Sequence, residues 1–312
     1  MRIASWFATA VFLACATAEP AFGYFLSNGS VQVDVTKSGA SIGLLRYKGT
    51  NFTLRKGRLF SDRYFRHRDK VHCEYEDSSG WVWKECGREQ LTNGVCCCYS
   101  TELKMFDLTV EKCYFLPVDR NSLVVTWTFR NHAEVPRHVG LYTTLPMMVE
   151  GGPNAVAVPR GGNVERWNYP ERKNPLEIAD TPSQRWSAMW ERTGGRGVIV
   201  KWPEHRTSGV FNWMVPDQET VTLECFGVDE AVPEGGVCSY STVLDFTDDV
   251  PRAIESIDCP TGELVGEPSM WIKRFTDSAR FRHCTVKARR LDGVKVSAKE
   301  AEQELNRDFR IP

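Results

Sequence analysis

Alternation of apolar and polar residues runs along most of the chain and predicts many short β-strands. Val31, Val33 and Val35 alternate with polar residues, the pattern of a strand with one buried face. Similar segments follow, separated by residues typical of turns. They span residues 42–47, 71–75, 81–86, 96–101, 108–115, 123–129, 138–145, 197–202, 209–213, 220–226 and 238–246. This pattern predicts a mostly β fold of the sandwich or barrel type.

Three segments carry more local predictions. Residues 71–75 and 81–86 flank a turn-rich stretch and are predicted to form a hairpin. Residues 150–182 are rich in glycine and proline, which predicts a long loop of the kind that often serves function. A capping box at residues 297–300 is followed by Ala301 and Leu305 at helical spacing, so one C-terminal helix is expected.

The N-terminus has the pattern of a cleaved export signal. Arg2 precedes an uncharged apolar run that is too short to span a bilayer, and small residues then offer cleavage after Ala18 or Gly23. We therefore expect a signal peptide over residues 1–23, a secreted or periplasmic location, and no membrane span. Residues 24–312 are expected to form one domain, with 247–312 as a possible appendage, because no linker-like composition divides them.

The cysteines favour disulfides over a metal site. Eleven are present, and Cys15 lies in the export signal, so ten remain in an exported chain. No cysteine pair has the spacing of a zinc site, so neither a metal nor a cofactor is expected. In a strand, Cys96 and Cys98 share one face and Cys97 the other, so these three are expected to have different partners.

Charge narrows the class of partner. The chain carries 39 basic and 40 acidic residues, a formal net charge of −1. A nucleic-acid-binding protein normally has a basic excess, so nucleic acid is not an expected partner. Acceptor sequons at Asn28 and Asn51 would be glycosylated in a eukaryotic secretory pathway, but the motif is short and does not identify the source.

Three stretches resemble the galactose mutarotase-like (aldose 1-epimerase-like) supersandwich superfamily, across residues 24–246. The first has an apolar strand at 24–35, a glycine turn and a second strand at 42–49. The second is a strand ending in Asn131 and His132, a polar turn and the strand from His138. The third is a strand carrying Glu224, followed by a Pro-Gly turn and the strand 239–246. The resemblance implies an antiparallel β-supersandwich and a carbohydrate ligand.

The resemblance also implies acid and base groups. In aldose 1-epimerases of this superfamily a glutamate is the base and a histidine the acid, and Glu224 occupies the position that resembles the glutamate. No histidine stands at the expected place after Pro136; Tyr142 is nearest, with His138 earlier and His205 as another candidate. From the residues alone, Glu224 is in phase with Thr220 and Thr222 and could equally be a solvated surface group.

Aromatic and polar residues suggest ligand contacts. Trp167 stands beside Tyr169 in the predicted loop, and Arg185 beside Trp186; such pairs can stack on a sugar and hydrogen-bond to it. Asn131 completes the candidate set through the resemblance. Most tryptophans in a β core, however, serve packing. A basic run over residues 55–70 is interleaved with Phe60, Tyr64 and Phe65 and is either a surface for anionic polysaccharide or a solvated stretch.

We therefore expect an exported carbohydrate-binding protein that holds a glycan in a groove on one sheet. An enzyme is the alternative: a sugar epimerase using Glu224 with a histidine, or a polysaccharide lyase using Tyr142, His138 and Arg185. A structural surface protein without a small ligand is the third possibility. Catalysis predicts that Glu224 and a histidine converge on one pocket within hydrogen-bonding reach of a shared sugar, and a Glu224 far from every histidine and tyrosine would remove the epimerase. Simple binding predicts exposed tryptophans along a groove without such a pair.

Overall fold

The computed structural model describes residues 24–53, 59–67, 73–77, 83–103, 107–160, 163–169, 176–178, 185–202, 207–215, 220–227, 230–255 and 257. Within these ranges the chain forms twenty strands and one short helix. None of the helical structure in these ranges is long and apolar enough to cross a membrane.

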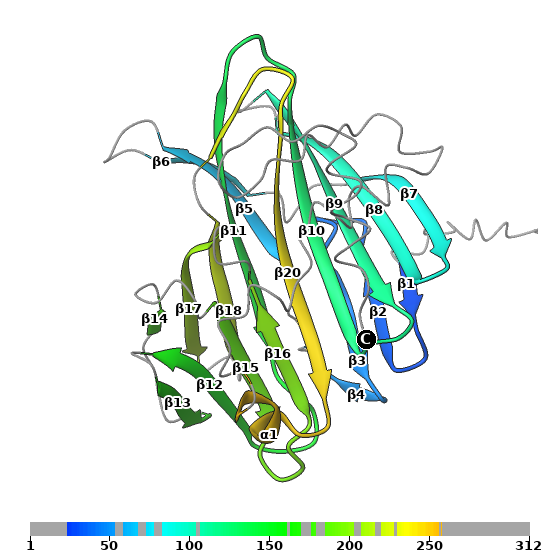
Figure 1. The fold of residues 1–312 in the computed structure, drawn as a ribbon, viewed down its shortest axis with the longest axis vertical. Helices are drawn as coiled ribbons and strands as arrows, with labels where there is room; N and C mark the ends of the chain where they lie inside the picture. Colours follow the sequence, from blue (N-terminus) through cyan, green and yellow to red (C-terminus); the bar gives the residue numbers. More distant parts are fainter. Residues whose placement is uncertain are drawn as a thin grey trace, which may run out of the picture.

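The largest sheet has nine antiparallel strands in the order β13-β12-β15-β16-β20-β10-β9-β8-β7. Figure 1 shows β10 and β20 side by side along the length of the molecule. The strands are β7 (Lys84–Leu91), β8 (Gly94–Leu103), β9 (Leu108–Pro117), β10 (Ser122–Asn131), β12 (Asn154–Arg160), β13 (Asn163–Asn168), β15 (Trp186–Glu191), β16 (Gly197–Lys201) and β20 (Val237–Thr247).

The second sheet has seven strands and lies against the first. Its order is β14-β17-β18-β11-β5-β6, with β19 paired to β11. The strands are β5 (Ser61–His67), β6 (Cys73–Asp77), β11 (Arg137–Met147), β14 (Leu176–Ile178), β17 (Thr207–Val215), β18 (Thr220–Gly227) and β19 (Glu230–Val232).

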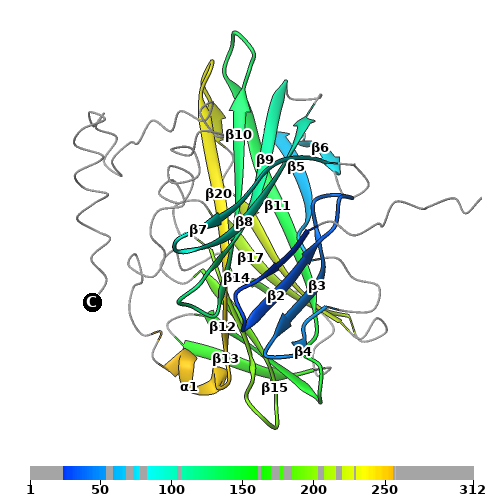
Figure 2. The same cartoon turned by 90° about the vertical axis from the view of Figure 1, so that its right-hand side faces the viewer.

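A small sheet and a helix complete the fold. The small sheet contains β1 (Tyr24–Ser27), β2 (Val31–Val35), β3 (Ile42–Tyr47) and β4 (Thr50–Asn51) in that order. Figures 1 and 2 both show it, in blue, beside β8. Helix α1 (Val250–Glu255) buries Val250 and Ile254 against the outer face of the nine-stranded sheet, at Trp186, Trp190 and Ile199.

The hydrophobic core lies between the two large sheets. Alternate residues of each strand point into it, which is why the apolar positions of the sequence recur every second residue. The ring of Phe129 on β10 packs edge-on against Tyr64 on β5, with centroids 5.6 Å apart, and against Tyr240 on β20 at 5.5 Å. The Tyr240 hydroxyl also donates to the carbonyl of Val139 on β11 at 3.0 Å. The prediction of an antiparallel β-supersandwich is therefore confirmed.

The predicted loop at residues 150–182 is wrong where the structure describes it. Strands β12 and β13 pair across this region, with Ala155 opposite Asn168 and Arg160 opposite Asn163. The glycine pair at 161–162 that favoured a loop separates these two strands along the chain. Glycine and proline therefore separate strands here, and the continuous apolar run of residues 155–159 was the stronger signal.

Two further local predictions need correction or lie outside the described residues. The predicted hairpin between residues 71–75 and 81–86 does not form: β6 pairs with β5, and β7 pairs with β8. Each segment thus pairs with its other neighbour along the chain: β6 with the strand before it and β7 with the strand after it. Helix α1 had no prediction, and the expected C-terminal helix near Ala301 lies outside the described residues.

The cysteines of β8 follow the predicted alternation. Cys97 faces the main core, whereas Cys96 and Cys98 face the outside of the nine-stranded sheet among buried apolar residues. Cys98 forms a disulfide with Cys113, its register partner on β9. Cys96, Cys97 and Cys225 are buried thiols, so a disulfide for every cysteine is wrong for these three. The side chain of Cys73, and Cys259 and Cys284, lie outside the described part of the chain.

Candidate functional site

The candidate site lies on the face of the seven-stranded sheet that turns away from the core. On β11, Leu141 and Leu145 are buried in the core, whereas Tyr142 and Thr144, which lie between them in the sequence, are half-buried. On β18 the same alternation buries Leu223 and leaves Glu224 half-buried. The two strands thus present polar groups on a shared surface, which we call the polar face.

Tyr142 and Glu224 are in direct contact on the polar face. The Tyr142 hydroxyl donates a hydrogen bond to a carboxylate oxygen of Glu224. Antiparallel register places Glu224 opposite Thr144 and Tyr142 opposite Phe226, so the two side chains are diagonal neighbours. Long side chains reach across such a diagonal. The sequence named both residues as candidates, and the structure brings them together.

Strand β5 borders the polar face on the other side of β11. Thr144 lies opposite Ser61, and Tyr142 opposite Arg63, in the β5–β11 register. Phe60, which precedes β5, adopts a left-handed backbone conformation with φ +62°. Its amide donates to the Thr144 carbonyl at 2.9 Å. This bond extends the pairing of β5 and β11 at Thr144, the residue that lies opposite Glu224 on β18.

A buried polar network lies on the core side of β11, directly behind the polar face. Thr143 donates to Asp62 Oδ1 at 2.7 Å, and Trp127 Nε1 donates to Asp62 Oδ2 at 2.9 Å. Lys112 Nζ binds the same Oδ2 at 2.6 Å and the Phe60 carbonyl at 2.9 Å. The network ties β5 and β11 to the opposite sheet and fixes the backbone from which Tyr142 projects.

The two histidine candidates do not join the pair within the described structure. His138 is exposed and lies on β11 in phase with Tyr142, four residues away, roughly 13 Å along an extended strand. Its register partner is Ala231 on β19, away from β18. His205 lies outside the described residues. Of the expected acid and base groups, the structure therefore unites Tyr142 with Glu224 and leaves His138 apart.

Arg185 and Trp186 are buried at different places from the pair. Arg185 is 7% exposed, and its Nε donates to the Thr207 carbonyl at 3.4 Å. Trp186 is 6% exposed and packs beneath α1 with Val250 and Ile254. Both side chains therefore have packing or hydrogen-bonding roles inside the protein.

The remaining ligand candidates also lie off the polar face. Asn131 is 1% exposed, and its amide nitrogen donates to the carbonyls of Val135, Val232 and Pro233 at 2.8–3.1 Å. Trp167 and Tyr169 lie on and just after β13, an edge of the other large sheet, and both pack partly buried against the main core.

The aromatic part of the basic run belongs to the core. Phe60 and Tyr64 are fully buried, as is Asp62 between them, because these residues form the inward phase leading into β5. The idea of aromatic rings interleaved with basic groups on one surface is therefore wrong for Phe60 and Tyr64. The side chains of Arg63 and Phe65 lie outside what the structure describes.

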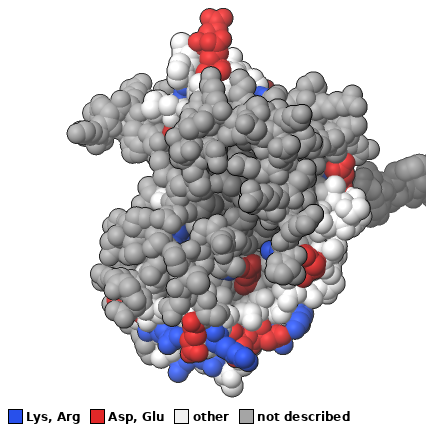
Figure 3. All heavy atoms as spheres, in the orientation of Figure 1, with Lys and Arg blue, Asp and Glu red and all other residues white. Residues whose placement is uncertain are grey.

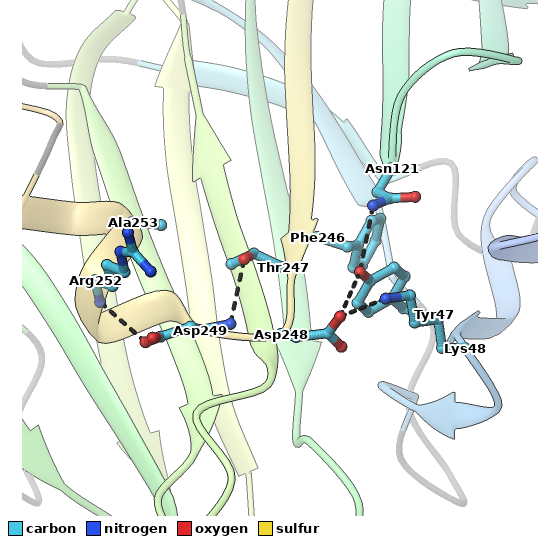
Figure 4. Close-up of a pocket in the computed structure, with 9 residues that line it drawn as sticks. All are labelled: Tyr47, Lys48, Asn121, Phe246, Thr247, Asp248, Asp249, Arg252 and Ala253. Carbon is cyan, nitrogen blue, oxygen red and sulfur yellow. Dashed lines mark hydrogen bonds and ion pairs between the residues drawn. The ribbon is translucent and has the colours of Figure 1, made fainter.

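A second polar feature is a pocket of about 480 Å³ at the end of the sandwich, shown in Figure 4. Its hydrogen-bonding groups come from Tyr47, Lys48, Asn121, Asp248 and Arg252. Lys48 and Gly49 form the tight turn between β3 and β4, both with positive φ, and this turn brings the Lys48 ammonium to Asp248 after β20. Figure 3 shows charges of both signs gathered at this end of the molecule.

One carboxylate of this pocket, that of Asp248, is held by two cations. Asp248 forms ion pairs with Lys48 and with Arg196, whose Nε is 3.0 Å away. The hydrogen bond from Lys48, followed by that from Arg196, holds the pKa of Asp248 below its usual value. The rings of Tyr47 and Phe246 stack on each other at 5.6 Å and are buried. The ring faces of Tyr47 and Phe246 are therefore not open to a ligand in this pocket.

A possible metal-binding group occurs at the disulfide. The sulfurs of Cys98 and Cys113 and a carboxylate oxygen of Glu111 lie within 4.8 Å of one another. The two sulfurs are joined to each other and are therefore not thiolate ligands in this state. Glu111 has a pKa raised by burial. The arrangement fits a disulfide with a nearby carboxyl group and does not fit a metal centre.

Comparison with solved structures identifies the fold. The chain is similar to a galactose mutarotase-like protein from Lactobacillus casei, with a TM-score of 0.53, 11% identity, and coverage of 72% of this chain and 99% of that one. It is also similar to a galactose mutarotase related enzyme from Lactobacillus acidophilus, with a TM-score of 0.51, 12% identity, and coverage of 73% of this chain and 98% of that one. A third similar structure is the GalM/aldose epimerase homologue from C. elegans, with a TM-score of 0.51, 10% identity, and coverage of 73% of this chain and 100% of that one.

The class is therefore set at the level of architecture: this chain has the galactose mutarotase-like supersandwich fold. No protein-family model matches the sequence, and the comparison with curated protein sequences gives no match. Such low identity establishes the fold alone, and a fold can host several activities. The function has to be argued from the site.

Proposed function

We propose that this chain is an exported carbohydrate-binding protein that holds its glycan on the polar face, centred on Tyr142 and Glu224. The observation that carries the proposal is the hydrogen bond between these two half-buried side chains on the non-core face of a sheet. A carboxylate and a phenol hydroxyl together accept and donate hydrogen bonds, which matches the vicinal hydroxyls of a sugar. The sugar-related fold supports the same class of ligand.

The pair favours this site over the pocket of Figure 4. In the pocket, Asp248 is already held by ion pairs with Lys48 and Arg196. On the polar face the carboxylate of Glu224 accepts a hydrogen bond from the neutral hydroxyl of Tyr142. A sugar hydroxyl that takes the place of Tyr142 exchanges one hydrogen bond to the carboxylate for another of the same kind.

Binding accounts for the pair better than catalysis does. General acid–base catalysis works best when the pKa values of the groups lie near the working pH, and an ordinary tyrosine has a pKa of about 10. A histidine would be the better acid, but His138 lies roughly 13 Å from Tyr142 along β11. The polar face therefore holds a base without a matched acid among the described residues.

Sugar 1-epimerisation is a second candidate, favoured by the same contact. In that reaction Glu224 would take the proton of the anomeric hydroxyl while Tyr142 gives its proton to the ring oxygen as the bond from that oxygen to the anomeric carbon breaks. The reverse steps on the rotated aldehyde close the other anomer, and each group recovers its starting protonation state. Adjacent anomeric and ring oxygens match a base and an acid that lie side by side.

A glycan array with the purified mature chain tests the binding proposal. We expect selective binding of at least one saccharide class, with loss of the signal in Glu224→Gln and retention in His138→Ala. Absence of binding to every glycan, or equal binding by Glu224→Gln, would overturn it. A polarimetric assay of anomer interconversion tests the second candidate, since wild type must exceed Glu224→Gln for catalysis to stand.

Export is tested separately. The apolar N-terminal segment followed by small residues supports cleavage of a signal peptide after Ala18 or Gly23. We expect mass spectrometry of the protein recovered from the medium or periplasm to give a mature N-terminus just after Ala18 or Gly23. An intact N-terminus on protein confined to the cytosol would contradict export while leaving the glycan proposal in place.

A further inference from the structure

Lys112 and Asp62 form a fully buried pair between the two large sheets. Both side chains have 0% exposure, and Lys112 Nζ lies 2.6 Å from Asp62 Oδ2. Lys112 occupies the inward phase of β9, where Val110, Tyr114 and Leu116 are core residues. One sequence signal marks this site: a lysine stands at a position that strand alternation assigns to the core.

The surroundings of Lys112 are aromatic. Its ammonium nitrogen lies 5.5 Å from the ring centroid of Trp127 and 5.7 Å from those of Phe60 and Tyr114. Burial lowers the pKa of Lys112, and the nearby Asp62 partly opposes that effect. Burial therefore favours the neutral amine of Lys112, which has the lone pair of a nucleophile.

The Asp62 carboxyl group is arranged as an electrophile. Thr143 donates to Oδ1 at 2.7 Å, and Trp127 donates to Oδ2 at 2.9 Å. The Tyr64 hydroxyl lies 3.4 Å from Oδ2. Hydrogen-bond donors on both oxygens stabilise the negative charge that develops when a nucleophile adds to the carboxyl carbon. The carboxyl carbon of Asp62 is bonded directly to Oδ2, the oxygen that Lys112 Nζ contacts.

We propose that Lys112 and Asp62 condense to an intramolecular isopeptide bond that joins β9 to β5 through the core. The neutral amine adds to the carboxyl carbon, and Thr143 and Trp127 stabilise the tetrahedral intermediate. One carboxyl oxygen then leaves as water, with two of the three protons that the Lys112 ammonium carried, and an amide with one N–H remains. The pair holds all the atoms required, so the step needs no oxidant, reductant or cofactor.

The bond would act as a covalent tie between the sheets. Lys112 and Asp62 are 50 residues apart, so an amide between them closes a long loop in the unfolded chain, as a disulfide does. The Cys98–Cys113 disulfide joins adjacent strands of one sheet, whereas this tie spans the sandwich and survives reduction. It is independent of any ligand on the polar face.

Intact-mass spectrometry of the wild-type protein, denatured and fully reduced, tests the proposal directly. We expect the mass to be lower than the sequence mass by one water molecule. Tryptic digestion should give one branched peptide, because trypsin cannot cleave after an acylated Lys112, and fragmentation should place the branch at Asp62. A mass equal to the sequence mass and two separate linear peptides, also after prolonged incubation of the folded protein, overturn the proposal.

The protein contains its own matched control. Lys201 and Asp245 approach as closely, at 2.5 Å, but Lys201 is 14% and Asp245 33% exposed, so this pair is open to solvent whereas Lys112 and Asp62 are not. We therefore expect no branched peptide that joins Lys201 to Asp245. Branched peptides at both lysine–aspartate pairs would indicate dehydration during sample preparation and would overturn the proposal for Lys112 and Asp62. In Lys112→Met the loss of one water molecule should disappear. Poor folding of this variant does not affect the test, because the mass of the wild-type protein alone decides whether the bond forms.

Discussion

The hydroxyl of Tyr142 on β11 donates a hydrogen bond to the carboxylate of Glu224 on β18, across two strands whose contacting residues are 82 positions apart in the chain. Neither residue belongs to the core, although their neighbours Leu141, Thr143, Leu223 and Cys225 are buried. A polar pair held over a rigid sheet is preorganised, so a ligand that uses it pays little to order the protein.

Removing either member of this pair should weaken glycan binding. Hydrogen bonds to charged groups contribute about 1.5–3 kcal/mol, so Glu224→Gln should raise the Kd roughly 10- to 100-fold. Tyr142→Phe should have a smaller effect, because it removes a neutral donor. Titration calorimetry of both single variants and the double variant measures the coupling, and strictly additive losses would show that the two side chains bind the ligand independently.

The ion pairs of Asp248 should stabilise the fold only above acidic pH. Hydrogen bonding by Lys48 and then Arg196 lowers the folded-state pKa of Asp248 below its unfolded value of 3.8. Its stabilisation is therefore fully present above that value and is lost as the pH falls through the lower folded pKa.

Chemical denaturation of wild type and Asp248→Asn across this range measures the effect. We expect wild type to have the larger free energy of unfolding near neutral pH, with the difference shrinking as the pH falls below 3.8 and through the lower folded pKa. High salt should shrink the difference, since these groups are partly exposed. A difference that stays constant from neutral to acidic pH would show that the charge of Asp248 has no part in it.

The buried thiols should resist alkylation in the folded protein. Burial raises the pKa of Cys96 and of Cys225 to about 12. The thiolate is the reactive form, and a pKa three units above the usual 9.0 reduces its fraction at pH 8 by roughly a thousandfold. Iodoacetamide labelling followed by peptide mapping should leave both residues unmodified until the protein is denatured. Rapid labelling of Cys225 in the native state would contradict its burial.

Asn131 should affect stability and leave glycan affinity unchanged. Its side chain donates to three backbone carbonyls and accepts from the Ala133 amide at 2.9 Å. In Asn131→Ala these buried groups lose their partner, at a cost of about 1–3 kcal/mol for each group left unsatisfied. Thermal and urea denaturation should show the loss, whereas the folded fraction should bind glycan with wild-type Kd. A weaker Kd with unchanged stability would instead place Asn131 at the ligand.

Alternation along the chain was enough to predict a mostly β fold of the sandwich or barrel type, because inward residues such as Val33, Val125 and Leu223 lie among alternating positions of their strands. The supersandwich architecture followed from the family resemblance. Local signals failed at the turns between strands. Strand β6 pairs with the preceding strand β5 instead of the following strand β7, and the glycine-rich region contains the paired strands β12 and β13. Turn residues indicate where one strand ends and the next begins, but not which of the flanking strands pair.

The candidate site was accessible from the sequence only in part. Glu224 and Tyr142 were both named, but their contact depends on the register between β11 and β18. His138 shares the phase of Tyr142 and was an equal candidate until the register placed it beside β19. The buried Asp62, Lys112 and Thr143 network had only one sequence signal, a lysine in the apolar phase of β9.

The most direct test of the glycan site is photocrosslinking with the tightest-binding saccharide from the array, carrying a small diazirine group, followed by peptide mapping. The account predicts crosslinks on β11 and β18 around Tyr142 and Glu224, which excess unmodified glycan abolishes. Specific crosslinks confined to the pocket residues Asn121, Asp248 and Arg252, with none on β11 or β18, would contradict it.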